Sequence, residues 1–338
     1  MRIPFVVPNT DTPSGGTLYD LRIDKAGTRT RTVPVPGTWP RPDPAAVRSL
    51  ERVLDAVPDG APVLIDGLVA CGVPEVVVAR TRRLRVVVVV HLPLARESGL
   101  PADEARDLDA RERRVLRACA GVVATGAWAA RHLREHHDLR TVHVVPPGVD
   151  AASLAGGGRP RPEGSASSPR LSCVASLTPR KGHRVLFQAL EGLADLDWTC
   201  VCVGPGTPLT PAPERVRFTG PLHGSDLDAA YDRTDLLVLP SLAETYGMVV
   251  TEALARGIPV VASAVGGVPE ALGQTPDHGV PGLLVPAGDP EALSGALRAW
   301  LTDPALRRRL RVAAHARRAG LADWSEAARA LEEVLDRV

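Results

Sequence analysis

Short apolar runs alternate with longer stretches of mixed polarity through the first half of the chain. Such runs are typical of buried strands, and they occur at residues 3–7, 63–65, 86–90, 121–125 and 142–145. The run at 86–90 consists of valines only, which is the pattern of a parallel strand covered on both faces. Residues 102–118 place Leu108, Val115 and Leu116 among charged residues, and this spacing predicts a helix.

The same alternation returns after residue 170 and is clearer there. It predicts strands at 171–175, 198–203, 216–219, 236–239, 259–262 and 282–285, and helices at 182–193, 227–231 and 249–255. Residues 290–338 follow a helical pattern in which Trp300 and Trp324 are the expected packing anchors. Strands that alternate with helices form a parallel sheet with helices on both faces. The predicted fold class is therefore α/β.

The segment between the two alternations has a different composition. Residues 155–169 (AGGGRPRPEGSASSP) are rich in Gly, Pro and Ser, which is typical of a linker. We predict an N-terminal Rossmann-like domain at 1–154, a linker at 155–169, a second Rossmann-like domain at 170–305 and C-terminal helices at 306–338 that cross back to the first domain. The alternative is a long surface loop within one domain. Ligands of doubly wound domains bind at the carboxyl ends of the strands, so a cleft between facing domains is the expected site.

Composition narrows the class of protein further. The chain has 338 residues, of which 44% are hydrophobic and 23% charged, and this composition excludes a disordered chain. Lys and Arg number 40 and Asp and Glu 39, a net charge of +1, which excludes a strong general field for nucleic acid. The sequence shows neither a membrane-length apolar run nor an apolar leader, and its five cysteines lack zinc-site spacing. We therefore expect a cytoplasmic protein.

One segment of the second domain, residues 235–272, combines acidic side chains with the start of a helix. Glu244 lies in a loop, and Glu252 lies inside the helix that we expect to begin near Tyr246-Gly247-Met248. Free N–H groups at a helix start bind anions, and Gly247 lets an anion approach the backbone closely. Eight helical residues span about 12 Å, the length of a sugar-diphosphate-ribose unit. The alternative interpretation is that both glutamates are solvated residues on a helix face.

These residues resemble the signature of retaining glycosyltransferases of family 4. The pattern is E-x7-E with Tyr-Gly after the first Glu, followed by E-A-x-A-x-G-x-P-V-V-A and G-G-V-P-E. The matching residues are Glu244, Gly247, Glu252, Ala253, Gly257, Pro259, Gly266, Gly267 and Glu270. The resemblance extends to 171–182 (LSCVASLTPRKG), 277–289 (DHGVPGLLVPAGD) and 13–19 (PSGGTLY), the last similar to the family's glycine loop. It implies the GT-B fold, in which two Rossmann-like domains face each other across a cleft, and transfer of a sugar from a nucleotide diphosphate sugar with retention.

The resemblance implies donor-binding roles in the second domain. Lys181 would neutralise the donor diphosphate, Glu252 would bind the ribose, and Glu244 would bind the transferred sugar. The backbone that would bind the sugar and the phosphates belongs to Tyr246, Gly247, Met248 and Val249. The family commonly has an arginine where this chain has Ser176, and Arg180 is the residue that would replace its charge. The base is expected to contact residues 218–223.

The resemblance also assigns roles in the first domain. His91, which follows the valine strand, would contact the donor sugar, and Gly16 would let the backbone approach a phosphate or the acceptor. A surface histidine and a simple turn are the alternative interpretations. His91, Glu244 and Lys181 form the expected catalytic set. Because this reading offers no carboxylate nucleophile, we expect a same-face mechanism in which the leaving diphosphate helps to deprotonate the acceptor.

Three Asp-Leu-Asp triplets, beginning at Asp107, Asp195 and Asp226, raise the question of a metal site. Paired aspartates bind Mg²⁺ or Mn²⁺ beside diphosphates in the other major glycosyltransferase fold. The first triplet lies in a predicted helix, the second precedes a strand, and the third fits a helix N-terminus, where Asp caps well. We therefore predict no metal and no cofactor, with Lys181 and a helix dipole neutralising the diphosphate.

The predicted partners are a nucleotide sugar donor and a small-molecule, glycan or lipid acceptor, without nucleic acid. Arginines at 80–85 and 111–117 suggest contact with a membrane surface, but interspersed acidic residues favour solvated helix faces. Two other functions remain open. A protein that binds nucleotide sugars without turnover is favoured by Ser176, whereas a dehydrogenase or epimerase is disfavoured because the chain lacks a GxGxxG motif between a strand and a helix.

Overall fold

The structure is a computed structural model that describes residues 2–10, 14–156 and 168–338. It divides into two compact units: unit 1 comprises Met1–Gly148 and Ala322–Val338, and unit 2 comprises Val149–Leu321. The sequence places the divisions at 154 and 305, whereas the structure places them at Gly148 and Leu321. Of the expected linker, residues 157–167 lie outside the described part of the chain.

Unit 1 contains a six-stranded sheet in which every neighbouring pair is parallel, in the order β2-β1-β3-β4-β5-β6. Its strands are β1 (Ile3–Pro8), β2 (Thr30–Val35), β3 (Pro62–Asp66), β4 (Arg85–Val90), β5 (Gly121–Ala124) and β6 (His143–Val144). The sequence analysis missed β2 because its residues, TRTVPV, form no apolar run. The strand order reverses between β1 and β3, which is the position where doubly wound sheets bind ligands.

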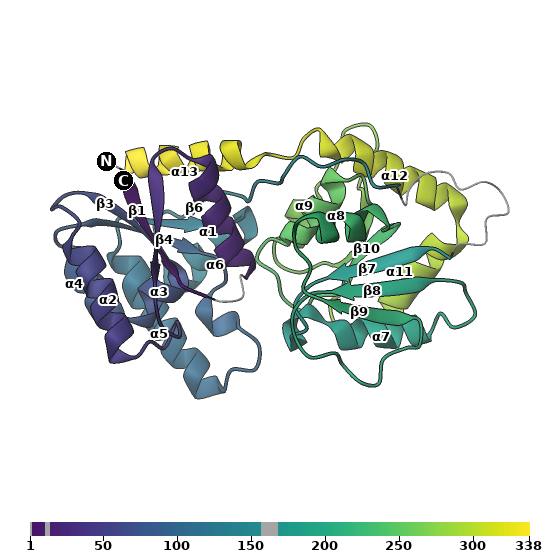
Figure 1. The fold of residues 1–338 in the computed structure, drawn as a ribbon, viewed down its shortest axis with the longest axis horizontal. Helices are drawn as coiled ribbons and strands as arrows, with labels where there is room; N and C mark the ends of the chain where they lie inside the picture. Colours follow the sequence, from purple (N-terminus) through teal and green to yellow (C-terminus); the bar gives the residue numbers. More distant parts are fainter. Residues whose placement is uncertain (1, 11–13, 157–167) are drawn as a thin grey trace. The chain divides into compact units, whose positions relative to one another are not determined.

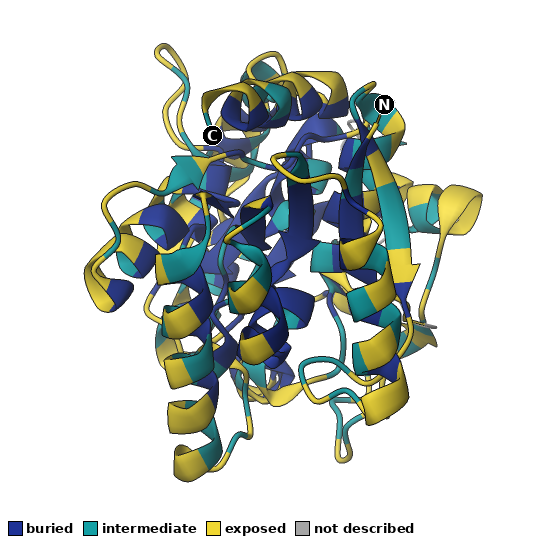
Figure 2. Ribbon diagram, turned by 90° about the vertical axis from the view of Figure 1, so that its left-hand side faces the viewer, coloured by how far each residue is buried: buried dark blue, intermediate teal, exposed yellow. Residues whose placement is uncertain are grey.

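Helices cover both faces of this sheet, and Figure 2 shows buried strands flanked by helices with exposed outer faces. They are α1 (Gly15–Ala26), α2 (Pro44–Asp55), α3 (Gly67–Gly72), α4 (Pro74–Arg80), α5 (Ala102–Ala118), α6 (Ala127–His137), α13 (Trp324–Arg337) and the 3₁₀ turn η1 (Leu94–Arg96). The expected glycine loop is corrected here: Gly15 and Gly16 open helix α1, and the Ser14 side chain caps it. A Ser N-cap satisfies a free N–H group, so a helix can begin directly at the glycine pair.

The last helix, α13, packs in unit 1 although it follows the whole of unit 2 in the sequence. The ring of Trp324 contacts the ring of Tyr19 edge-on, with centroids 5.9 Å apart. A carboxylate oxygen of Glu332 accepts the backbone N–H groups of Thr28 and Arg29 at 2.9 and 3.1 Å. The backbone of Gly148 passes so close to this helix that an added Cβ would lie 2.4 Å from the Trp324 nitrogen.

Unit 2 contains a second parallel six-stranded sheet, in the order β12-β11-β10-β7-β8-β9. Its strands are β7 (Arg170–Val174), β8 (Thr199–Val203), β9 (Val216–Gly220), β10 (Leu236–Leu239), β11 (Val260–Ser263) and β12 (Gly282–Val285). Read from its first strand, this is the Rossmann order. The reversal point lies between β7 and β10.

The helices of unit 2 lie on both faces of its sheet (Figure 1). They are α7 (His183–Glu191), α8 (Gly224–Asp232), α9 (Met248–Ala255), α10 (Val268–Leu272), α11 (Pro290–Thr302), α12 (Pro304–Arg318) and the 3₁₀ turn η3 (Pro179–Lys181). The expected continuous helical tail consists of α11, α12 and α13. Asp303 ends the first of these and caps the second, because its carboxylate accepts two N–H groups of α12.

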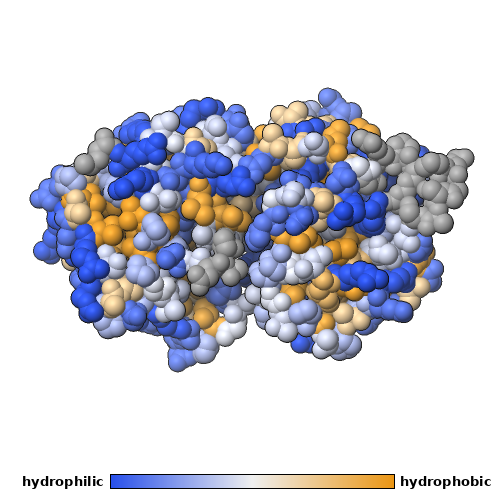
Figure 3. Space-filling model, viewed as in Figure 1, coloured by the Kyte–Doolittle hydropathy of each residue, from blue (hydrophilic) through white to orange (hydrophobic). Residues whose placement is uncertain are grey.

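The surface and the helix composition bear on membrane contact. Figure 3 shows hydrophilic residues interspersed with hydrophobic ones on the visible face of each unit. Among the described helices, none combines the length and the apolar character that crossing a membrane requires. The five cysteines are free thiols, four of them buried and Cys119 partly so.

The fit of α13 against Gly148 yields a stability prediction. Gly148→Ala adds a methyl group where only backbone atoms of α13 are available to move, so we expect a loss of about 1–3 kcal/mol. Gly295→Ala is the matched control, since Gly295 lies in α11 with nothing within 4 Å of an added Cβ. The control should gain about 0.5–1 kcal/mol from helix propensity. Thermal unfolding measures both changes. Equal melting temperatures for the two variants would contradict the close packing of Gly148 against α13.

Candidate functional site

The reversal point of the unit 2 sheet brings together two residues that are 63 positions apart, Lys181 and Glu244. Lys181 ends the 3₁₀ turn after β7, and Glu244 lies in the loop after β10. Lys181 Nζ donates a hydrogen bond of 2.5 Å to Glu244 Oε1. The Ser241 hydroxyl lies 2.8 Å from the same oxygen. Glu244 is 7% exposed, so this carboxylate is held by charge and hydrogen bonding inside the unit.

Backbone contacts explain why these two loops meet. Gly182 has φ +69°, and an added Cβ would lie 2.0 Å from the carbonyl oxygen of Pro240. The Leu242 N–H also donates to the Arg180 carbonyl at 2.7 Å. Only glycine fits a left-handed conformation with such a close neighbour, so this residue fixes the distance between the loops.

Arg180 points its guanidinium into the same cluster. Its Nη1 donates to the Ala243 carbonyl at 3.1 Å and lies 3.8 Å from Glu244 Oε2. The cluster therefore brings two cations, Arg180 and Lys181, to one carboxylate. Ser176 lies in the loop that follows β7. The role of Arg180 as a replacement for an arginine at that position stays a prediction.

Helix α9 begins beside this cluster. It starts at Met248 after Gly247, whose φ is +93°, within the segment Tyr246-Gly247-Met248 where the sequence predicts its start. Only part of the interval from Glu244 to Glu252 is helical, so the 12 Å helical span does not describe it. The backbone of Tyr246, Gly247, Met248 and Val249 forms the turn and the first turn of the helix. No side chain among the described residues caps the first N–H groups, which therefore remain free for a ligand.

Glu252 lies farther along α9 and contacts a buried ring. The Tyr231 hydroxyl donates to Glu252 Oε2 at 2.6 Å, and the Arg256 guanidinium stacks over the Tyr231 ring at 4.5 Å from its centroid. Burial raises the pKa of Tyr231 well above its ordinary value, and the Glu252 carboxylate adds to this shift. The tyrosine is therefore a neutral donor that orients Glu252.

Phe218 and the three Asp-Leu-Asp triplets were also singled out in the sequence. Phe218 lies in β9, where its ring contacts the Phe187 ring at 6.0 Å, so core packing occupies one edge of this ring. In the Asp-Leu-Asp triplets, Asp107 pairs with Arg111 and Asp195 with Arg298. Asp226 lies in the first turn of α8, but the N-cap residue is His223 and no side-chain cap bond is made there, so the expected capping role of Asp226 is wrong.

Unit 1 brings together two predicted residues, Gly16 and His91, and two that were not predicted, Asp20 and Asp66, at the reversal point of its own sheet. An added Cβ on Gly16 would lie 2.8 Å from the His91 ring. His91 Nε2 lies 2.8 Å from Asp20 Oδ1 and 3.3 Å from Asp66 Oδ2. Asp66 ends β3, and Asp20 lies on α1 one turn after Gly16. His91 is thus held between two carboxylates and is not the isolated surface residue of the alternative interpretation.

The two carboxylates set the charge of this histidine. Burial opposes protonation of the His91 ring, but the Asp20 carboxylate and then Asp66 outweigh burial and raise the pKa of His91 above its ordinary value. Burial also raises the pKa of Asp20, although His91 partly offsets this. His91 is therefore cationic at neutral pH.

The same three side chains meet a geometric condition for a metal site. Asp20, Asp66 and His91 each offer one ligand atom, and these atoms lie within 4.8 Å of one another. In the structure His91 Nε2 fills the space between the carboxylates. The absence of a metal from the reaction stays a prediction.

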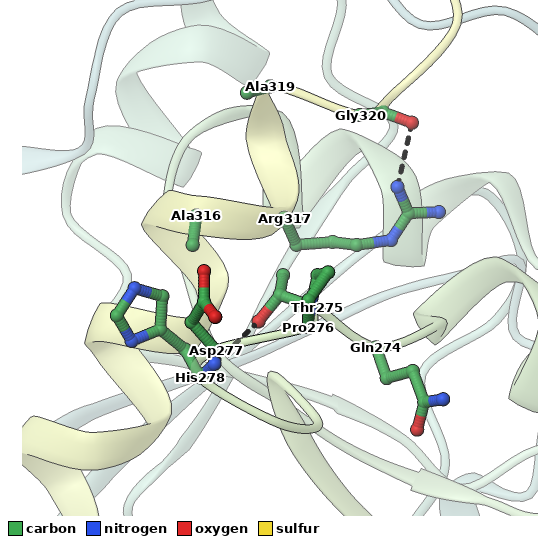
Figure 4. Close-up of a pocket in the computed structure, with 9 residues that line it drawn as sticks. All are labelled: Gln274, Thr275, Pro276, Asp277, His278, Ala316, Arg317, Ala319 and Gly320. Carbon is green, nitrogen blue, oxygen red and sulfur yellow. Dashed lines mark hydrogen bonds between the residues drawn. The ribbon is translucent and has the colours of Figure 1, made fainter.

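A pocket elsewhere in unit 2 does not include these residues. It lies between the segment Gln274–His278 and the end of α12 (Figure 4). Arg317 lines it, and its Nη1 donates to the Gly320 carbonyl at 2.8 Å. The Leu272 carbonyl accepts a second bond from the same guanidinium. Backbone carbonyls thus occupy this arginine.

Several residues of the candidate site were not predicted from the sequence. Asp66 had a signal, because it directly follows a predicted strand and ligands bind at strand ends. Asp20 follows Gly16 by four residues, which places both on one face of a helix, but the segment was expected to be a loop. Ser241 and Tyr231 had no signal, since only the fold brings them to Glu244 and Glu252.

Comparison with family models identifies the chain. The model described as Glycosyltransferase Family 4 matches residues 5–153, and that described as Glycosyl transferases group 1 matches residues 168–303. The chain belongs to glycosyltransferase family 4. One model matches most of unit 1 and the other most of unit 2. Together they include the residues of the His91 cluster and of the Lys181–Glu244 cluster.

Curated relatives of this family-4 chain carry a common name. The D-inositol 3-phosphate glycosyltransferase 1 of Catenulispora acidiphila is 34% identical over 280 residues, which are 74% of this chain and 66% of that protein. The D-inositol 3-phosphate glycosyltransferase of Corynebacterium glutamicum is 32% identical over 241 residues, 63% of this chain and 56% of that protein. The chain therefore spans only about half to two thirds of the length of these relatives.

Solved structures agree on the fold. Sucrose-phosphate synthase from Thermosynechococcus elongatus is 19% identical, with a TM-score of 0.78 and 99% of each chain covered. Anabaena HepE in complex with UDP-glucose is also 19% identical, with a TM-score of 0.76 over all of both chains. The fold is GT-B, which confirms the predicted fold class.

The His91 cluster yields a prediction about protonation. Asp20→Asn removes the carboxylate that does most to stabilise the His91 cation, so we expect the pKa of His91 to fall and the ring to lose its proton at lower pH. Ring signals followed by NMR across a pH titration measure this, with His91→Gln to assign the signal. His143, which is remote from the cluster in sequence, is the internal control and should titrate unchanged. An unchanged His91 titration would show that Asp20 does not set its charge.

Proposed function

We propose that this chain transfers a sugar from a nucleotide diphosphate sugar to an acceptor, with retention of the anomeric configuration. The observation that carries the proposal is the Lys181–Glu244 pair beside the open start of α9, at the reversal point of the unit 2 sheet. A cation, free backbone N–H groups and a buried carboxylate suit a phosphorylated sugar. Membership of family 4 supports the same reaction class.

In this proposal unit 2 binds the donor. Lys181 and Arg180 neutralise the diphosphate together with the start of α9, where the helix dipole favours anions. Glu252, oriented by Tyr231, accepts hydrogen bonds from the ribose hydroxyls. Glu244 gives up part of its contact with Lys181 and accepts a hydroxyl of the sugar. The site thereby exchanges an internal ion pair for one with the substrate.

Departure of the nucleotide diphosphate leaves negative charge on its β-phosphate. Lys181 and the N–H groups of Met248 and Val249 stabilise that charge, which is the larger part of the catalysis we propose. The departing phosphate then accepts the acceptor's proton on the same face of the sugar. No metal is required, since two cations and a helix start face the phosphate.

In unit 1 we assign the acceptor hydroxyls and the sugar to the His91 cluster. His91 presents a cationic ring whose orientation Asp20 and Asp66 fix, and the backbone of Gly16 lies against this ring, where an added Cβ would be 2.8 Å from it. HepE is known in complex with UDP-glucose, and the curated relatives are named for D-inositol 3-phosphate. UDP-glucose and inositol phosphate are therefore the first donor and acceptor to try.

A donor panel tests the function directly. The purified chain is incubated with UDP-, GDP- and ADP-sugars, with and without an acceptor such as inositol phosphate, and released nucleotide is measured. The proposal expects release of one nucleoside diphosphate that increases with acceptor. Thermal stabilisation by a nucleotide without any release would instead indicate a binding protein, and a response to NAD alone would indicate a dehydrogenase.

The two glutamates should affect different kinetic constants. Glu252→Ala removes the ribose contact made in both ground and transition states, so KM for the donor should rise about 10- to 100-fold. Glu244→Ala should mainly lower kcat, because we expect its contact with the sugar to be strongest in the transition state, when Lys181 contacts the departing phosphate. Glu191→Ala, at the exposed end of α7, is the control and should leave both constants unchanged. Wild-type kinetics in both site variants would remove the assignment.

A further inference from the structure

A second cluster of ligand side chains in unit 1 lies outside the proposed reaction. Asp109 on α5 meets His136 and His137 from the last turn of α6, and one possible ligand atom from each lies within 4.8 Å of the others. His136 Nε2 is 2.5 Å from Asp109 Oδ1. Asp109 belongs to an Asp-Leu-Asp triplet that the sequence analysis rejected as a metal site. The fold adds two imidazoles that the triplet alone does not show.

The two ring nitrogens of His137 give a second, independent indication of a ligand. It is fully buried, and its Nε2 lies 2.9 Å from Oε2 of Glu112, which is 1% exposed. A carboxylate accepts hydrogen bonds, so Nε2 carries a proton, and in the neutral ring Nδ1 then carries the lone pair. Nδ1 is buried, yet it has no hydrogen-bond partner among the described residues. An unpartnered buried nitrogen is costly, and it needs a ligand.

This arrangement is that of a metal-binding histidine. Ligating histidines usually donate their other N–H to a carboxylate, which fixes the tautomer and leaves the free nitrogen for the metal. The Glu112–His137 pair supplies that geometry inside the unit. Glu112 is itself held, because its Oε1 accepts the Leu94 N–H at 3.2 Å.

Neighbouring side chains hold the other two ligands. The His136 ring stacks on His132 at 5.5 Å and 8° between planes, and His132 stacks on Trp128 in the same way. Arg113 Nη2 lies 3.3 Å from the second oxygen of Asp109. The stack limits rotation of His136, while Arg113 orients the carboxylate and lowers the affinity for a cation.

We propose that Asp109, His136 and His137 Nδ1 bind one Zn²⁺ ion that joins α5 to α6. Two imidazoles and one carboxylate form a ligand set of zinc, with the fourth position open to water. The half-exposed His136 and Asp109 give the ion access from solvent. Ligands about 2.0–2.1 Å from zinc lie about 3.3 Å apart, so the His136–Asp109 contact opens slightly on binding.

The ion has a structural role because of its place in the fold. Helix α6 follows β5 and returns toward the amino end of the strands, so its last turn lies at the edge opposite His91. Zinc there stabilises the helix pair and takes no part in sugar transfer. The inference does not depend on the proposed function.

The experiment uses the full chain after dialysis against EDTA. Titration with Zn²⁺ by calorimetry should give one saturable site and a raised melting temperature, and Co²⁺ should give the visible absorption of a tetrahedral ion. His136→Ala and Asp109→Asn should each weaken Zn²⁺ binding at least about tenfold. Both substitutions lie at partly exposed positions, and circular dichroism of the metal-free variants checks that they fold.

Two controls distinguish this site from its surroundings. His132→Ala removes a neighbouring imidazole on the same helix face and should retain the stoichiometry. His91→Gln removes the other candidate metal cluster of unit 1 and should leave Zn²⁺ binding intact. Absence of saturable binding, or binding lost in His91→Gln and kept in His136→Ala, would overturn the proposal.

Discussion

The candidate donor site depends on one close backbone contact, between Gly182 and the carbonyl of Pro240. The loops after β7 and β10 belong to neighbouring strands, but parallel strands bring only their ends together and not the loops beyond them. Gly182 can approach the carbonyl because it has no side chain. That approach places Lys181 at hydrogen-bonding distance from Glu244. A larger residue would separate the loops, and the ion pair with them.

Much of this arrangement is predictable from the sequence because it follows from strand order and short motifs. Buried strands such as the valine run before His91 have a strong signal, and residues that follow such strands come together at one edge of the sheet. The roles of Lys181 and Glu244 were predicted instead from the resemblance to a family signature. The helix of 102–118 was predicted to the residue, since three apolar side chains among many charges fix its face.

Other features were not predictable, for reasons that differ between residues. The strand at 30–35 has alternating polar residues and a proline at the sheet edge, so it has no apolar run. Tyr231 meets Glu252 from a separate helix, and no local pattern encodes a contact between helices. The glycine pair at 15–16 is typical of a turn, and only the Ser14 cap shows that a helix begins there. That error hid Asp20, because a loop gives no reason to place it beside Gly16.

The two reversal points follow the same topological rule but collect different charges, and this difference supports the proposed placement of the substrate's parts. In unit 2 the cluster brings Arg180 and Lys181 to the Glu244 carboxylate beside a helix start. In unit 1, His91 is flanked by two carboxylates, so the cluster is neutral or negative according to the proton on Asp20. A diphosphate would be repelled there, whereas hydroxyl groups would find both donors and acceptors. This difference supports the proposal that the phosphates bind beside Lys181 and that acceptor hydroxyl groups bind beside His91.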